Sequence, residues 1–230
     1  MSFYLIWARV ALVCYLLALV VALVAARRRG SSGLTRAAVA TGFLFQFVGL
    51  VEALAAFPAQ PIDLYQVITA LLAFVVAAFF LMVYRTHSPR ALSLLVLPLI
   101  VVLAAVAGLA PMGARSGPSP LARSLLHNGW IYVHILLIMV GYAGLVVAMA
   151  AGVLYLAAER SLKAKSAPLA AEHWMPPLEK LDLLAYRALL VGFPLLTGGL
   201  VIGAYWADAL FGRVSLGDPT VMLALLAWAI

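Results

Sequence analysis

Residues 130–157 read WIYVHILLIMVGYAGLVVAMAAGVLYLA, a run without one charged side chain. A helix of about 20 apolar residues is long enough to cross the hydrocarbon core of a bilayer, so this stretch predicts a membrane-spanning helix. The whole chain has the same character, because 67% of its 230 residues are hydrophobic and 10% are charged. Soluble domains carry about 25% charged residues. We interpret the chain as an integral membrane protein.

Apolar runs of the required length recur along the chain. We expect six full spans, at Phe3–Ala26, Ala37–Phe57, Tyr65–Tyr84, Ala91–Ala110, Trp130–Ala157 and Leu183–Asp208. A seventh helix starts near Thr220 and reaches about half a bilayer by Ile230, which favours a chain that continues further. The sequence thus predicts an all-α, polytopic transmembrane helical bundle. It divides into an N-terminal four-helix membrane region over residues 1–110 and a second region over residues 111–230.

Lys and Arg are distributed unevenly between the expected loops. Four of the 15 basic residues, Arg9, Arg115, Arg123 and Arg213, fall on one side, and the remaining eleven fall on the other. Because basic residues mark the cytoplasmic side, we expect the N-terminus and the Ala207–Pro219 loop to lie outside a cell inner (plasma) membrane. The net charge of +7 reflects this bias and contact with membrane lipids. It gives no support for nucleic-acid binding.

Motifs of soluble enzymes are absent from the sequence. Its one cysteine, Cys14, lies inside the first span, so the chain has no Cys-x-x-Cys pair. It also lacks a phosphate-binding loop, a His-Glu-x-x-His zinc motif and a Gly-x-Ser-x-Gly elbow. We therefore predict no catalytic residue and no enzyme activity for this chain alone.

One histidine, His134, lies about one turn inside the outer end of the fifth span. An ionisable group at this depth is costly and usually functional. Small residues let a second helix approach closely, and the sixth span carries the complementary pair Gly199 and Gly203. We expect His134 to point into the bundle, either as a metal ligand or hydrogen-bonded to a neighbouring helix. It sits above a stripe at three- and four-residue steps, formed by Leu137, Gly141, Gly144, Ala148, Gly152 and Tyr155.

Aromatic residues gather at the same expected outer boundary. An aromatic belt at the membrane surface is the ordinary explanation of such a cluster, and a cover for a planar ligand is the alternative. Asp218 is followed by Pro219, a pair that suits the start of the seventh helix. Glu52, inside the second span, is an intramembrane acid that is either protonated or paired with a positive group. The aromatic residues of the cluster are Trp130, Tyr132, Tyr205, Trp206 and Phe211.

The chain from Trp130 to Trp228 carries an ordered set of short motifs. They are Trp130-x-x-x-His134, Gly141-Tyr142-Ala143, Gly192-Phe193-Pro194-Leu195-Leu196-Thr197, Gly203-Ala204-x-Trp206-Ala207, Asp218-Pro219 and Ala224-Leu225-x-x-Trp228. This set resembles the cytochrome c assembly family of the CcsA/ResC/CcmC type. Ser215 and Gly217 stand where haem-handling members carry two tryptophans. The resemblance therefore points to the HemX/YpjD-like branch of that family.

The resemblance implies haem binding or handling at the outer membrane face. His134 would ligate the iron as a metal ligand, with Trp130, Trp206, Phe211 and Asp218 as further cofactor-binding residues. Other cytochrome c assembly proteins would be its partners, and the chain would be at most one component of a haem-attachment system. The alternative is a non-haem membrane accessory or regulatory protein that kept the fold and lost the Trp-rich site. A small-solute transporter is a third interpretation, but only Pro194 hints at the broken helices it would need.

The second axial ligand of a bound haem is open. His127 and His134 are seven residues apart, about 10 Å along one helix. They cannot both bind one iron unless the helix begins after His127. The other sources are a residue beyond Ile230 and a partner protein.

Overall fold

The computed structural model describes residues 3–28, 33–56, 64–87, 90–109, 129–163, 176–211 and 219–229. Within these ranges the chain forms seven α-helices, six of which are long and apolar enough to cross a membrane. The predicted all-α architecture, with six spans and a short further helix, is therefore confirmed. The helices are α1 (Phe3–Arg28), α2 (Gly33–Ala56), α3 (Leu64–His87), α4 (Arg90–Leu109), α6 (Gly129–Lys163), α8 (Leu178–Phe211) and α9 (Pro219–Ala229).

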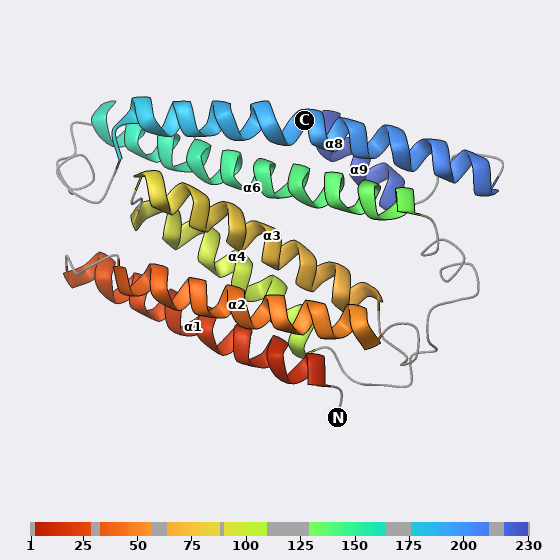
Figure 1. The fold of residues 1–230 in the computed structure, drawn as a ribbon. Coiled ribbons are helices and arrows are strands. Elements are labelled where there is room, and N and C mark those ends of the chain that lie inside the picture. Colours follow the sequence, from red (N-terminus) through yellow and green to blue (C-terminus); the bar gives the residue numbers. More distant parts are fainter. Residues whose placement is uncertain are drawn as a thin grey trace.

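The long helices stack as three antiparallel pairs (Figure 1). The pair α3 and α4 lies in the middle: it contacts α1 and α2 on one side and α6 on the other. Among the described elements, the pair α6 and α8 has the most extensive contact, and α9 packs against α8. One side of α8 is thus open to the surroundings of the bundle.

Five of the six spanning helices are longer than their apolar runs predicted, and α6 and α8 exceed the prediction most. α6 continues six residues past Ala157 to Lys163, where Lys163 and Glu159 form an ion pair of 2.7 Å at i and i+4. α8 begins five residues before Leu183, directly after Pro177, whose carbonyl accepts the amides of Lys180 and Leu181 at 3.0 and 3.2 Å. Charged residues are good helix formers, so these helices extend beyond the hydrocarbon where hydropathy alone would end them.

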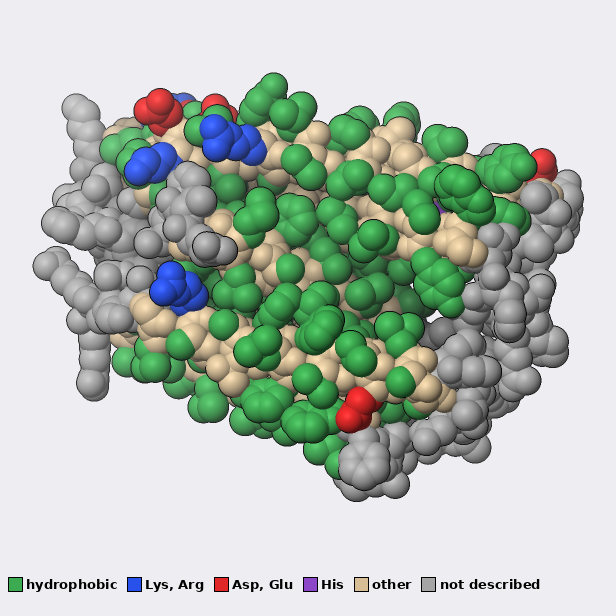
Figure 2. All heavy atoms as spheres, viewed as in Figure 1, with side chains coloured by type: hydrophobic (Ala, Val, Ile, Leu, Met, Phe, Trp, Pro, Cys, Tyr) green, Lys and Arg blue, Asp and Glu red, His purple; other side chains and the backbone are tan. Residues whose placement is uncertain are grey.

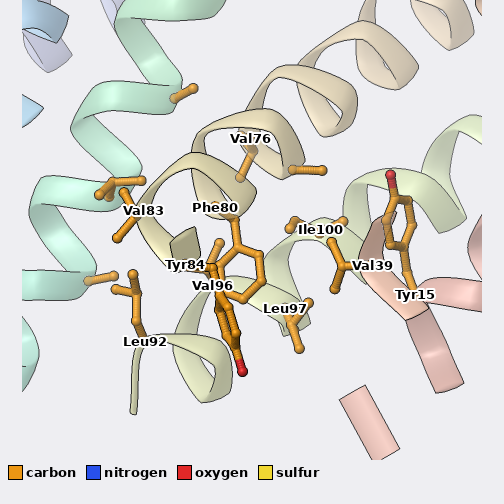
Figure 3. Packing of buried hydrophobic residues seen from close by; sticks show 14 of the residues in the cluster. Tyr15, Val39, Val76, Phe80, Val83, Tyr84, Leu92, Val96, Leu97 and Ile100 are labelled. Carbon is orange, nitrogen blue, oxygen red and sulfur yellow. The ribbon is translucent and has the colours of Figure 1, made fainter. Parts of the chain in front are cut away.

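The core of the α1–α4 region is apolar and fully buried (Figure 3). Val76 and Phe80 of α3 pack with Leu97 and Ile100 of α4, and all four side chains are fully buried. Large apolar side chains also cover the outer surface (Figure 2). Such a surface would associate in water, whereas in lipid it is solvated. The helices themselves are held by close packing and polar contacts, because lipid removes the hydrophobic drive between them.

A buried polar chain ties three helices together inside this core. The hydroxyl of Tyr15 donates to Gln46 Oε1 at 2.6 Å, and Gln46 Nε2 donates to the carbonyl of Ala70 at 2.8 Å. The tyrosine ring fits because α2 has a glycine opposite: a Cβ at Gly42 would lie 2.8 Å from the ring. Glu52 on the same helix differs, since its Oε2 is buried without a hydrogen-bond partner and no positive partner is found within the described ranges.

Lys and Arg gather at one end of the bundle. On the face drawn in Figure 2, the basic side chains lie toward the end where α6 finishes and α8 starts. His134, Trp130 and Trp206 lie toward the opposite end, because α6 begins and α8 finishes there. The uneven distribution of Lys and Arg that the sequence predicted between the two sides is therefore also found between the two ends of the folded bundle.

Candidate functional site

His134 lies on the side of α6 that faces α8. Its Nδ1 is 2.7 Å from the carbonyl oxygen of Gly199. A carbonyl can only accept, so Nδ1 must carry the proton and donate it. In the neutral imidazole this leaves Nε2 with a free lone pair. The expectation that His134 points into the bundle is confirmed, and the hydrogen bond fixes its tautomer.

A second glycine, one turn further along α8, makes room for the imidazole ring. A Cβ at Gly203 would lie 2.6 Å from His134 Cε1 and 3.0 Å from Nδ1. The ring therefore rests directly on the backbone of α8, at a distance that no other residue type permits without a shift. Gly199 supplies the hydrogen-bond acceptor and Gly203 supplies the space. The two glycines hold the ring in one position.

The predicted close contact between small residues of these two helices is confirmed, but its pairing differs. Gly199 and Gly203 meet Ile138 and His134, rather than the glycines of α6. Because the helices are antiparallel, residues later in the sequence of α6 meet residues earlier in the sequence of α8. The glycines of α6 accordingly meet Leu196, Gly192 and Ala188, with Cβ distances of 2.8 Å from Gly141 to Leu196 N and from Gly144 to Gly192 Cα.

The stripe of small residues also ends sooner than its spacing indicated. A Cβ at Gly152 would meet no atom within 4 Å, although it continues the same three- and four-residue steps. Gly192 was not part of the predicted contact, yet its Cα would lie 2.8 Å from a Cβ added at Gly144. The register between α6 and α8 therefore decides which glycines of one helix contact the other.

An aromatic groove lies toward the same end of the bundle as His134, although His134 is not among the residues that line it. Its volume is about 570 Å³, within the roughly 300–1,000 Å³ of small-molecule and cofactor sites. The predicted site residues Trp130 and Trp206 both line it, so the fold brings these two together. Trp206 meets Tyr205 edge to face, with ring centroids 5.9 Å apart. The residues that line the groove are Trp130, Val201, Ile202, Tyr205 and Trp206.

The groove contains residues that the predicted site did not include. Tyr205, Val201 and Ile202 stand with Trp206 on one face of α8, since 201 and 205, and 202 and 206, are each four residues apart. That spacing was available from the sequence as a signal. Two predicted site residues cannot be placed: Phe211 ends α8 with a side chain outside the described residues, and Asp218 lies wholly outside them.

The short helix α9 is fastened to α8 by one tryptophan. Trp228 stacks on Phe193 with centroids 5.9 Å apart and an interplanar angle of 20°. Its Nε1 donates to the hydroxyl of Thr197 at 3.0 Å. The aromatic residues of the two helices therefore serve two purposes: Trp228 docks α9, and the rings nearer the end of α8 line the groove.

Ligands for a metal are sparse in the described part of the chain. No group of three or more His, Cys, Asp and Glu side chains comes together within it. His127 lies outside the described residues. His134 is the one imidazole whose side chain the described ranges include.

Residues 5–230 match the Cytochrome C assembly protein family. The chain belongs to this family. The match includes α1–α4, and so extends well upstream of the Trp130–Trp228 motifs that carried the resemblance.

Several relatives carry the description cytochrome c biogenesis protein CcsA. The protein of Heterosigma akashiwo is 28% identical over 177 residues, which cover 64% of this chain and 54% of the relative. That of Prochlorococcus marinus (strain MIT 9515) is 31% identical over 121 residues, covering 45% of this chain and 39% of the relative. That of Chlamydomonas reinhardtii is 32% identical over 112 residues, covering 49% and 30%.

The chain spans about half the length, or less, of the curated relatives it matches. No solved structure matches it. These comparisons establish the family.

Proposed function

We propose that this protein binds and handles haem at one face of the membrane, with His134 Nε2 as an axial ligand of the iron. The observation that carries the proposal is the hydrogen bond from Nδ1 to the carbonyl of Gly199. Histidines that bind metals characteristically donate their other ring N–H to such an acceptor, which fixes the tautomer and the ring orientation. The family membership supports the same cofactor.

Haem would bring an iron centre whose redox state is set by its axial ligands and their surroundings. The chain's own contribution is positioning. Gly199 and Gly203 hold the imidazole, and the aromatic groove toward the same end of the bundle offers flat surfaces for a macrocycle. Trp130 and Trp206 are the rings we assign to that cover, while Phe211 and Asp218 remain proposed cofactor-binding residues of the same end. The second axial ligand would come from His127, from residues after Ile230, or from a partner.

We also propose the membrane and the side of it on which the His134 end lies. The charge asymmetry favours an inner (plasma) membrane with the His134 end outside. Other cytochrome c assembly proteins are the partners that the family suggests, and the chain would act as one component of a haem-attachment system rather than as an enzyme alone.

Absorbance spectroscopy of the purified protein tests this function. Protein from haem-replete cells should show a Soret band, and His134→Ala should abolish or shift it. His87→Ala and His173→Ala are the matched controls, since the sequence places both on the opposite side of the membrane, and they should leave the band intact. Gly203→Ala should shift the band as well, because the added Cβ displaces the imidazole.

The competing function is a non-haem accessory or regulatory protein of the HemX/YpjD-like branch. One observation favours it: the same Nδ1 hydrogen bond already gives His134 a complete structural role between two helices. Ser215 and Gly217, in place of two tryptophans, favour it too. A protein that purifies colourless and takes up no added haem, and in which His134→Ala lowers only thermal stability, would refute the haem proposal and favour this function instead.

A further inference from the structure

A second groove lies between α3, α6 and α8, in the half of α8 far from His134. Its volume is about 370 Å³. Eight of its nine lining residues are apolar, among them Met82 of α3, Val147 of α6 and Leu190 of α8. The ninth is Arg187. An apolar groove with a single guanidinium in its lining suits a ligand with an apolar body and an anionic head.

Arg187 has no counter-charge in the described part of the chain. Its side chain is exposed, and the ion pair found within the described ranges joins Glu159 to Lys163. Asp182 lies on the same helix, but five residues earlier, so it points to a different side and not to the neighbouring i–3 or i–4 position. No carboxylate of the described residues neutralises this guanidinium, so it is available to an anion from outside the fold.

The depth of Arg187 fits the boundary between headgroups and acyl chains. It stands nine residues after Leu178, the first residue of α8, which is about 14 Å along the helix axis. A long arginine side chain can extend from there toward the membrane surface while its stem stays among apolar groups. This is also the end of the bundle where Lys and Arg gather (Figure 2).

We propose that this groove is a binding site for one anionic glycerophospholipid. Its phosphate pairs with the Arg187 guanidinium, whose planar fork matches phosphate oxygens, and an acyl chain lies along the apolar walls. Basic pockets between spans at the cytoplasmic side are recognised lipid sites. The groove is separate from the haem proposal, because it shares no lining residue with the aromatic groove near the end of α8.

Native mass spectrometry of the detergent-purified chain tests the site, with phosphatidylglycerol and phosphatidylcholine titrated in parallel. The wild type should retain one phosphatidylglycerol more strongly than phosphatidylcholine. Arg187→Ala should weaken the phosphatidylglycerol adduct about fivefold, as expected for one basic contact with an anionic lipid. Val191→Trp, which fills the groove from a half-exposed wall position, should weaken both lipids and keep the protein folded.

Lys180→Ala is the matched control. It removes one positive charge from the same helix end, from a position that does not line the groove, and it should leave the phosphatidylglycerol adduct unchanged. Equal retention of both lipids by the wild type, or equal loss in Lys180→Ala and Arg187→Ala, would overturn the proposal. Full displacement of the lipid by millimolar inorganic phosphate would assign the site to a soluble anion and overturn it as well.

Discussion

Replacing Gly144 by alanine adds a methyl group where α6 and α8 touch backbone to backbone. The new Cβ would lie 2.8 Å from Gly192 Cα and 3.0 Å from the carbonyl oxygen of Ala188. Neither atom can rotate away, so the two helices must separate by several tenths of an ångström. In lipid this costs packing that no hydrophobic effect restores.

The magnitude can be isolated with a second glycine on the same helix. Gly152→Ala adds the same methyl group to α6 but meets nothing within 4 Å. Both variants gain the same helix propensity, up to about 1 kcal/mol, so this term cancels between them. The difference in unfolding free energy is then the cost of overpacking, about 1–3 kcal/mol. For a chain of this size it corresponds to melting temperatures about 2–12 °C apart.

Thermal unfolding of both purified variants in one detergent measures this difference. Gly144→Ala should melt below the wild type, and Gly152→Ala at or above it. If the two variants melt at the same temperature, the α6–α8 contact is not formed at Gly144. The packing of the His134 ring against Gly199 and Gly203 would then be refuted as well, because it depends on the same register between the two helices.

Three further outcomes are expected. Gln46→Leu should lower the unfolding free energy by about 1–3 kcal/mol, because the buried hydroxyl of Tyr15 loses its acceptor; thermal melts that match the wild type would contradict this. Trp228→Ala should raise hydrogen exchange in α9 and leave α1–α4 unchanged, since stacking and one hydrogen bond, together about 1–3 kcal/mol, hold α9 on α8; unchanged exchange in α9 counts against that docking. Topology reporters fused after Arg29 and after Gly212 should give opposite results, with the first in the cytoplasm, and two cytoplasmic signals would refute the orientation.

Some features of the site followed from the sequence and some did not. The depth of His134 and its small-residue surroundings predicted an inward-facing imidazole, and the structure places it so. Its partners were not predicted. The sequence pointed to glycine against glycine, whereas the fold sets Gly199 and Gly203 against Ile138 and the imidazole. Spacing along one helix identifies a face, but it carries no information about the register of the helix opposite.

The class of the protein, its six spans and its charge asymmetry were determined by the sequence alone. Each depends on local quantities: a span needs enough consecutive apolar residues, and its backbone bonds are all satisfied within the helix. The ends of α6 and α8, the contact between Gly144 and Gly192, and the grooves beside Trp206 and Arg187 were decided only by the tertiary structure. In lipid, helices associate through the fit of their surfaces rather than through hydrophobicity, and that fit exists only once both helices are in place.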